Sequence, residues 1–206
     1  SALRILIESL PAERISELAE LANDLEDGPV LAAIFSDFAQ RPQLNVNPIL
    51  ITKLASPAAD VRAESIRALG KRSAIEARDH IARLLDDAND DVKQAAAETA
   101  GLLKGENVQD VLLTYAGHDH KGLAGASLES LRLLNNDRAA PSAVSLLKHR
   151  DTQLTALRYL SEFGTPAHVD QIVSTADGNL SSELQLESVS TLLAWRQRFP
   201  TSASKI

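Results

Sequence analysis

Apolar residues recur at intervals of 31 along most of this chain. One column contains Val30, Val61, Val92, Leu123 and Leu154, a second contains Phe35, Ile66, Ala97, Leu128 and Tyr159, and a third contains Phe38, Leu69, Ala100 and Leu131. At 44% apolar composition, one column of five is entirely apolar by chance with a probability of roughly 0.016. Two such columns, with a third of four apolar members, therefore predict a chain built of repeated structural units.

Each unit is predicted to be an antiparallel pair of helices. Val61, Ser65, Ala68 and Leu69 have the i, i+4, i+7, i+8 spacing of a helix stripe. A preceding helix is expected to end on Leu54, Leu85, Ala116 and Leu147 in successive copies. We expect a single domain over 1–206, with repeats at 1–10 (partial), 11–41, 42–72, 73–104, 105–136, 137–165 and 166–199, and a tail at 200–206. The period slips where Glu162 enters an apolar column, which indicates a one-residue insertion.

Turn residues predict where the helices begin and end. Asn47, Ser56 and Thr165 each precede a proline and are expected to cap a helix start. Gly70 and Gly101 are expected to end their helices in the left-handed conformation.

Composition excludes several classes of protein. Aromatic residues make up 3% of the chain, which disfavours a β-rich fold, and the absence of Cys removes disulfides and thiolate chemistry. A formal net charge of −7 argues against nucleic acid as the main partner. The sequence has no apolar run long enough to span a membrane and no targeting segment, so the localisation stays unknown. Because the chain opens at Ser1 directly in a helical pattern, we expect a segment of a larger protein.

Two segments carry a family resemblance. The sequences at 60–70 (DVRAESIRALG) and 91–101 (DVKQAAAETAG) resemble the second helix of HEAT repeats, most closely the bacterial lyase-type variants. The resemblance implies an all-α, right-handed α-solenoid of five to six helix pairs, the armadillo-type fold, with the second helices on its concave side. It further implies that Asp60 with Arg62, and Asp91 with Lys93, form a ladder between successive turns.

If second helices line the concave side, the residues opposite the apolar stripe form a ridge that faces a partner protein. These candidate binding residues are Glu64, Arg67, Gln94, Glu98, Glu129 and Arg132, with Gly125 among them. The alternative is a merely solvated helix face.

The negative charge is concentrated near the N-terminus. An acidic patch of Glu13, Glu17, Glu20, Asp24, Glu26 and Asp27 is a candidate for steering a basic partner. A solvated outer helix is the alternative.

Three histidines fall in equivalent turns. His118 and His120 lie in one turn, and His149 follows His118 by 31 residues. They are weak candidates for a zinc or nickel site, and the alternative is that they cap or solvate helix ends.

The sequence contains no nucleophile elbow or phosphate-binding loop. We therefore expect a non-catalytic scaffold, without a cofactor, that binds another protein or a neighbouring domain. The sequence leaves the oligomeric state unknown, and a monomer is favoured. The alternatives are an enzyme-accessory, lyase-type or metal-dependent protein that uses the turn with His118, His120 and His149, and a repeat module of a larger oxidoreductase.

Overall fold

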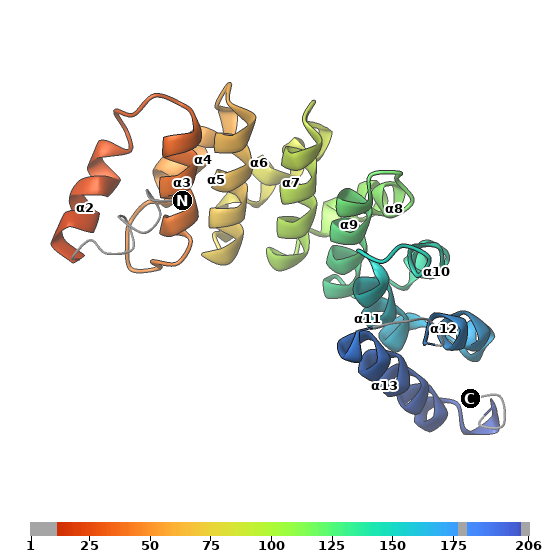
Figure 1. Cartoon of the computed structure of the whole chain (residues 1–206). Helices are drawn as coiled ribbons and strands as arrows, with labels where there is room; N and C mark the ends of the chain where they lie inside the picture. Colours follow the sequence, from red (N-terminus) through yellow and green to blue (C-terminus); the bar gives the residue numbers. More distant parts are fainter. Residues whose placement is uncertain (1–11, 177–180, 203–206) are drawn as a thin grey trace. The chain divides into compact units, whose positions relative to one another are not determined.

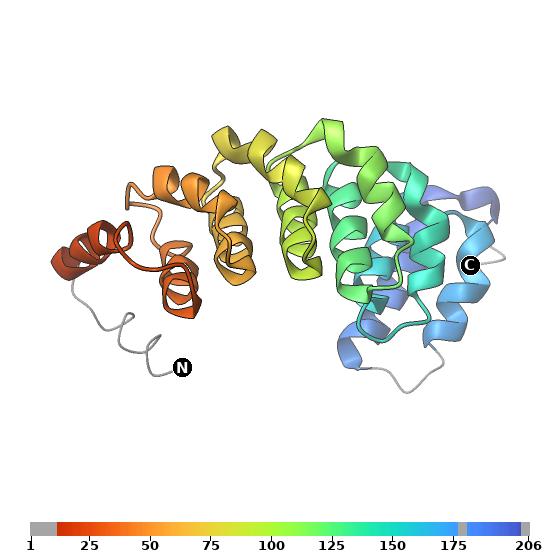
Figure 2. The ribbon, with the colours of Figure 1, turned by 90° about the horizontal axis from the view of Figure 1, so that it is seen from above.

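The computed structural model describes residues 12–176 and 181–202, and this part of the chain is helical without any strand. The chain divides into two compact units, Ser1–Val108 and Gln109–Ile206. No helix among the described residues is long and apolar enough to cross a membrane. Figure 1 and Figure 2 show the helices in two views.

The first unit places its longer helices side by side. Helices α3, α5 and α7 pack in that order, and the shorter α4 and α6 each pack on the helix that follows them (Figure 1). The helices are α2 (Ala12–Leu21), α3 (Pro29–Phe38), α4 (Asn47–Thr52), α5 (Ala59–Lys71), α6 (Arg78–Arg83) and α7 (Asp90–Leu102). Short 3-10 turns lie at η1 (Lys53–Ala55), η2 (Ile75–Ala77), η3 (Leu84–Asp86) and η4 (Glu106–Val108).

The second unit has the same plan. Helices α9, α11 and α13 are neighbours in that order, and α8, α10 and α12 each pack on the next helix in the chain (Figure 1). The helices are α8 (Gln109–Ala116), α9 (Lys121–Leu133), α10 (Ala140–Leu146), α11 (Gln153–Phe163), α12 (Val169–Ala176) and α13 (Ser182–Arg198). The 3-10 turns are η5 (Asp137–Ala139), η6 (Pro166–His168) and η7 (Pro200–Ser202). Each predicted full repeat from 42–72 onward contains one packed helix pair; the partial repeat 1–10 lies outside the described residues.

The repeated columns form the core, with one correction. Every member of the second and third columns is buried. In the first column, Val61, Val92 and Leu123 are buried and Leu154 is half-buried, but Val30 is 52% exposed and its neighbour Leu31 is buried instead. The prediction for Val30 is wrong because Leu31, and not Val30, has the i, i+4, i+7 helix spacing with the buried Phe35 and Phe38.

The glycine prediction is also wrong. Helices α5 and α7 continue through Gly70 and Gly101, and the left-handed residue comes three positions later, at Ser73 and Lys104, both with φ 54°. Asn135 repeats this position at the end of α9, with φ 55°. In each case the next backbone N–H donates to a carbonyl five residues back, at 2.9 to 3.0 Å. This is the hydrogen bond of a Schellman motif. These helices therefore end in a motif whose left-handed position is usually occupied by glycine.

Gly70 has a packing role instead. A Cβ at this position would lie 2.9 Å from both Cγ2 and Oγ1 of Thr99, on the next second helix. The absence of a side chain therefore allows α5 and α7 to approach closely.

The predicted caps have mixed outcomes. Thr165 forms a capping box with His168 and is confirmed. Asn47 does not cap α4, because it is the first helical residue and its side chain bonds to Glu76 and Arg72. The Ser56 hydroxyl accepts from the backbone N–H of Ala58, one residue before α5 begins, and does not occupy the cap position itself.

Arg72 organises the longest connection of the first unit. Its guanidinium donates to the backbone carbonyls of Phe38 and Arg41, at 3.1 and 2.7 Å, and to that of Leu44. These carbonyls lie at the end of α3 and in the loop that follows it. Arg72 therefore supplies hydrogen-bond donors to groups that the end of a helix leaves without partners. Burial lowers its pKa below the ordinary value for arginine.

Candidate functional site

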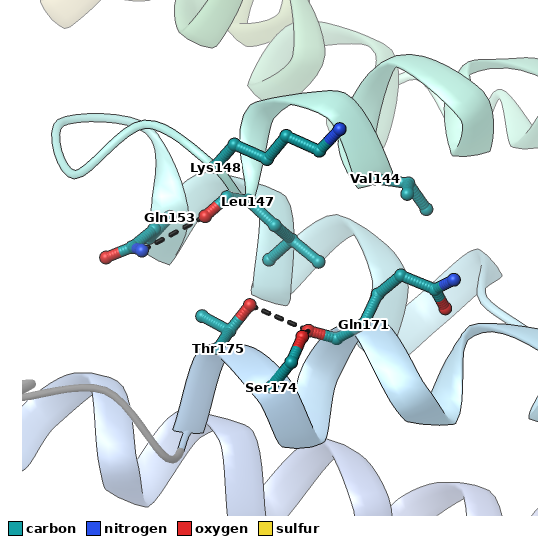
Figure 3. A pocket seen from close by; sticks show the side chains of 7 residues that line it. All are labelled: Val144, Leu147, Lys148, Gln153, Gln171, Ser174 and Thr175. Atoms are coloured by element: carbon teal, nitrogen blue, oxygen red, sulfur yellow. Dashed lines mark hydrogen bonds between the residues drawn. The ribbon is translucent and has the colours of Figure 1, made fainter.

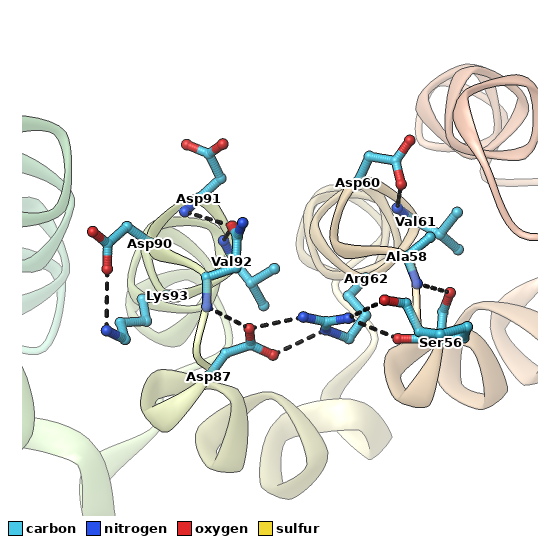
Figure 4. A network of polar contacts seen from close by, with 12 residues as sticks. Ser56, Ala58, Asp60, Val61, Arg62, Asp87, Asp90, Asp91, Val92 and Lys93 are labelled. Atoms are coloured by element: carbon cyan, nitrogen blue, oxygen red, sulfur yellow. Dashed lines mark hydrogen bonds and ion pairs between the residues drawn. The ribbon is translucent and has the colours of Figure 1, made fainter.

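The ladder between successive repeats uses different acids from those expected. Arg62 binds Asp87 in the next repeat, with Nε–Oδ2 and Nη2–Oδ1 distances of 2.9 and 2.8 Å (Figure 4). Asp60 accepts from the backbone N–H of Val61, so it does not pair with Arg62. Lys93 pairs with Asp90 at 3.1 Å and not with Asp91. The position of each aspartate explains this pairing. An aspartate at a helix start lies close to the N–H groups of its own helix, whereas Asp87 lies in the turn beside Arg62.

The acidic patch is divided between structural and exposed residues. Asp27 belongs to the fold, because it binds the Lys53 ammonium and accepts from the Ser56 hydroxyl at 2.6 Å. These two hydrogen bonds, that from Lys53 first, lower the pKa of Asp27. The prediction that Asp27 is part of a steering surface is therefore wrong. Glu17, which pairs with Arg14 at 2.7 Å, is exposed, as are Glu20, Asp24 and Glu26, whereas the Glu13 side chain lies outside the described part.

The predicted ridge is brought together in the first unit. Glu64 and Arg67 lie on α5, with Arg67 Nη1 2.8 Å from Glu64 Oε1. Arg67 Nε also lies 3.8 Å from Glu98 Oε2 on α7. The amide of Gln94 donates to Glu98 Oε1 at 2.9 Å. These four side chains form one half-buried polar network that joins two neighbouring second helices.

A groove adjoins this network. It has a volume of about 510 Å³ and is lined by Ala59, Asp60, Ala63, Glu64, Arg67, Asn89 and Asp91. The lining contains three carboxylates and one guanidinium, and that guanidinium is already bound by Glu64 and lies beside Glu98. Asp60 and Asp91 are exposed. The groove therefore presents negative charge to whatever enters it.

The second unit contains a similar arrangement. Arg132 binds both oxygens of Glu129 at 2.8 and 2.9 Å, and it also binds Glu162 on α11. The hydrogen bond with Glu129 is the largest cause that raises the pKa of Arg132 above its ordinary value. Glu162 is a ridge residue that the sequence analysis missed, although its departure from the apolar column was a visible signal. Gly125 is not on the ridge, since it is buried, and a Cβ added there would lie 3.3 Å from Thr152 Cγ2.

The histidine turn is used for capping. Nδ1 of His118 accepts from the backbone N–H of His120, and Nδ1 of His120 accepts from that of Leu123, both at 3.1 Å. His149 lies in the α10–α11 turn, where its backbone carbonyl accepts from the Thr152 hydroxyl. Within residues 12–176 and 181–202, no group of three or more His, Asp or Glu side chains is arranged to hold a metal ion. The geometry supports the capping alternative for His118 and His120 and does not support the weak metal candidates.

A second groove lies between α10 and α12 in the second unit (Figure 3). Its volume is about 320 Å³, and its lining is Val144, Leu147, Lys148, Gln153, Gln171, Ser174 and Thr175. The hydroxyls of Ser174 and Thr175 both donate to the backbone carbonyl of Gln171, at 3.0 and 2.7 Å. This lining contains no His, Asp or Glu that would activate either hydroxyl as a nucleophile.

The helix pairs, their short turns and the 31-residue register are matched by a known family model. The model describes HEAT repeats and covers residues 47–132. Residues 47–132 are HEAT repeats. This stretch contains α4 to α7 of the first unit and α8 and most of α9 of the second, together with all six predicted ridge residues.

Solved structures with a similar fold cover nearly the whole chain. A chain of the complex of CpcE and CpcF of phycocyanin lyase from Nostoc sp. PCC7120 is 15% identical, with a TM-score of 0.62 over 95% of this chain and 84% of that one. An engineered protein is 18% identical, with a TM-score of 0.55 over 96% of this chain and 97% of that one. At these identities the likeness concerns the fold alone. No curated protein matches the sequence.

Proposed function

We propose that this chain is a non-catalytic HEAT-repeat scaffold and that the groove beside Arg67 binds a cationic segment of a partner protein. The observation that carries the proposal is the charge of that groove. Asp60 and Asp91 offer exposed carboxylates, and the one cation in the lining, Arg67, is neutralised by Glu64 and Glu98. Lysine or arginine side chains are the groups that such a surface attracts.

Three further observations support a protein partner. The floor of the groove includes Ala59 and Ala63, whose small side chains leave room for a long side chain to enter. The exposed acids Glu20, Asp24 and Glu26 belong to the same unit and add negative potential that steers a basic partner. The complex from Nostoc contains two proteins, which is consistent with a repeat stack of this type binding another chain.

The test uses the 206-residue chain as bait in a lysate of the organism that encodes it. The Asp60→Lys, Asp91→Lys double variant reverses the charge of the groove, and the Asp79→Lys, Asp170→Lys double variant makes the same change of net charge at exposed positions outside the groove and the acidic patch. We expect a retained protein to be lost with the groove variant and kept with the control. A Lys- or Arg-rich segment of that protein, made as a peptide, is expected to bind the chain.

Two outcomes count against the proposal. If neither variant changes what is retained, the groove is not the binding surface. If both variants lose the same proteins, binding depends on net charge alone. Turnover of a substrate by the isolated chain would contradict the non-catalytic part.

An enzyme-accessory role is the second candidate. Its support is the likeness of fold to a chain from a phycocyanin lyase complex. Such a role also requires a protein-binding surface, and the groove beside Arg67 would serve as that surface in this case too. It is distinguished by the identity of the retained protein, which would then be an enzyme whose rate changes when the chain is added.

A further inference from the structure

Helix α13 has an aliphatic face that nothing in the described part of its unit covers. Leu186, Val189 and Leu193 are 68%, 52% and 54% exposed. Their i, i+3, i+7 spacing places them on one side of the helix. Figure 1 shows α11 and α12 bordering α13. Exposed apolar residues gathered on one face mark an interaction surface.

Helix α13 packs on its unit through other residues than Leu186, Val189 and Leu193. Trp195 is fully buried and donates from Nε1 to the backbone carbonyl of Leu160 on α11, at 3.0 Å. Ser188 and Thr191 are also buried, and their hydroxyls donate to backbone carbonyls of α13 itself at 2.8 Å. The helix is therefore anchored through one face, and the aliphatic stripe is not needed for that packing.

The stripe departs from the pattern of the preceding second helix. The positions 31 residues earlier on α11 are Thr155, Arg158 and Glu162, and each of them is polar or charged. On α11, Thr155 is half-buried, Arg158 lies 3.7 Å from Glu183, and Glu162 binds Arg132. The Leu and Val side chains on α13 cannot form such polar contacts, and their exposure indicates that this face is covered in the functional molecule.

We propose that the stripe on α13 binds the same stripe of a second copy of this chain, with the two helices antiparallel across a two-fold axis. The stripe is symmetric about its centre, which lies between Val189 and Ser190. An antiparallel copy therefore places Leu186 against Leu193 of the other chain and Val189 next to the axis. A self-complementary patch of this kind is what a two-fold interface requires.

Charge complementarity selects the second copy and the antiparallel orientation. The exposed face is uncharged between Glu183 and Arg196. Antiparallel pairing brings Glu183, which lies 3.7 Å from Arg158 of its own chain and stays 66% exposed, beside the end of the other copy that carries Arg196. It also opposes the two helix dipoles. Parallel pairing would put like charges together. The small side chains of Ser190 and Ala194 on the flank of the stripe allow the two helices to approach closely.

The decisive measurement is sedimentation equilibrium of the 206-residue chain from micromolar to millimolar concentration. We expect the mass to rise from 22.1 kDa for one chain toward twice that value. The Val189→Asp variant puts two carboxylates next to the axis and should remain monomeric throughout. Val173→Asp, which changes an exposed valine on α12, is the matched control and should still form dimers. Circular dichroism of both variants checks that the helices are intact.

Cysteine substitutions test the orientation, since the natural chain has no cysteine. Val189→Cys should form a disulfide-linked dimer under mild oxidation, and Leu186→Cys should not, because its counterpart in an antiparallel copy lies about two helical turns away. A strictly monomeric chain would mean that the stripe has another occupant and would overturn the proposal. Dimers that survive Val189→Asp would overturn it as well. Equal cross-linking of Leu186→Cys and Val189→Cys would overturn the antiparallel arrangement.

Discussion

Arg62 on α5 and Asp87 in the turn before α7 form a two-point ion pair that spans 25 residues of sequence. The side chains are only 15% and 9% exposed. Arg62 also donates to the backbone carbonyl of Ser56 at 2.8 Å, so one guanidinium joins the turns of two successive repeats. Burial acts to raise the pKa of Asp87, but the hydrogen bonds from Arg62 and from the backbone of Asn89 outweigh it, and the pKa lies below its ordinary value.

Asp87→Asn tests this pair. We expect a loss of about 2 kcal/mol in the free energy of unfolding at neutral pH, because the charged partner of a mostly buried guanidinium is removed. The folded-state pKa is depressed, so the wild-type advantage is fully present above the unfolded pKa of about 4 and disappears as the pH falls through the folded value.

The measurement is urea unfolding of both proteins across this pH range. Asp86→Asn, at an exposed neighbouring position, is the control and should stay within about 0.5 kcal/mol of wild type. A wild-type advantage that persists unchanged at pH 2 would contradict the assignment.

Arg72→Met should destabilise the first unit by about 2 kcal/mol. The substitution keeps an extended side chain but removes the donors to the carbonyls of Phe38, Arg41 and Leu44. Hydrogen exchange should show the largest loss of protection between α3 and α4. Arg83→Met is the matched control at an exposed position, and equal effects of the two substitutions would refute the role given to Arg72.

Gly164→Ala should destabilise the second unit by about 2 kcal/mol or more, because a Cβ there would lie 2.2 Å from Cζ2 of Trp195. The single tryptophan reports this directly through its fluorescence during unfolding. Gly28→Ala is the control: its extended backbone suits any residue and no atom lies within 4 Å of the added Cβ. A Gly164→Ala protein as stable as wild type would show that α11 and α13 are not packed in this way.

Lys104→Gly should stabilise the chain by about 1 kcal/mol, since Lys104 has a left-handed backbone that glycine adopts with less strain. Thermal unfolding should show a higher Tm. Lys93→Gly, inside helix α7, should have the opposite sign because glycine disfavours helix interiors. A lower Tm for Lys104→Gly would mean that the left-handed turn is not maintained in solution.

Much of the candidate site followed from periodicity. The 31-residue register placed Arg67 and Glu98 on equivalent faces of successive second helices, and the structure joins them in one network. The register could not reveal that Glu64 and Glu98 neutralise the charge of Arg67, because the pairing of side chains on two helices depends on how closely those helices approach. Gly125 was misplaced for a related reason: its face is covered by Thr152, which approaches from another helix.

The sequence alone determined the helical pairs, their length and the core columns, because these depend on the spacing of apolar residues along a helix. The columns containing Ile66 and Leu69 are buried throughout the described repeats. The tertiary structure decided which polar groups meet. Asp27 forms an ion pair with Lys53, and Arg72 donates to a backbone carbonyl at the end of α3. Local sequence fixes where a side chain leaves its own helix, but the partners of Lys53, Arg62 and Arg72 lie 25 or more residues away in the sequence. Only the packing of the repeats brings those groups within hydrogen-bonding distance.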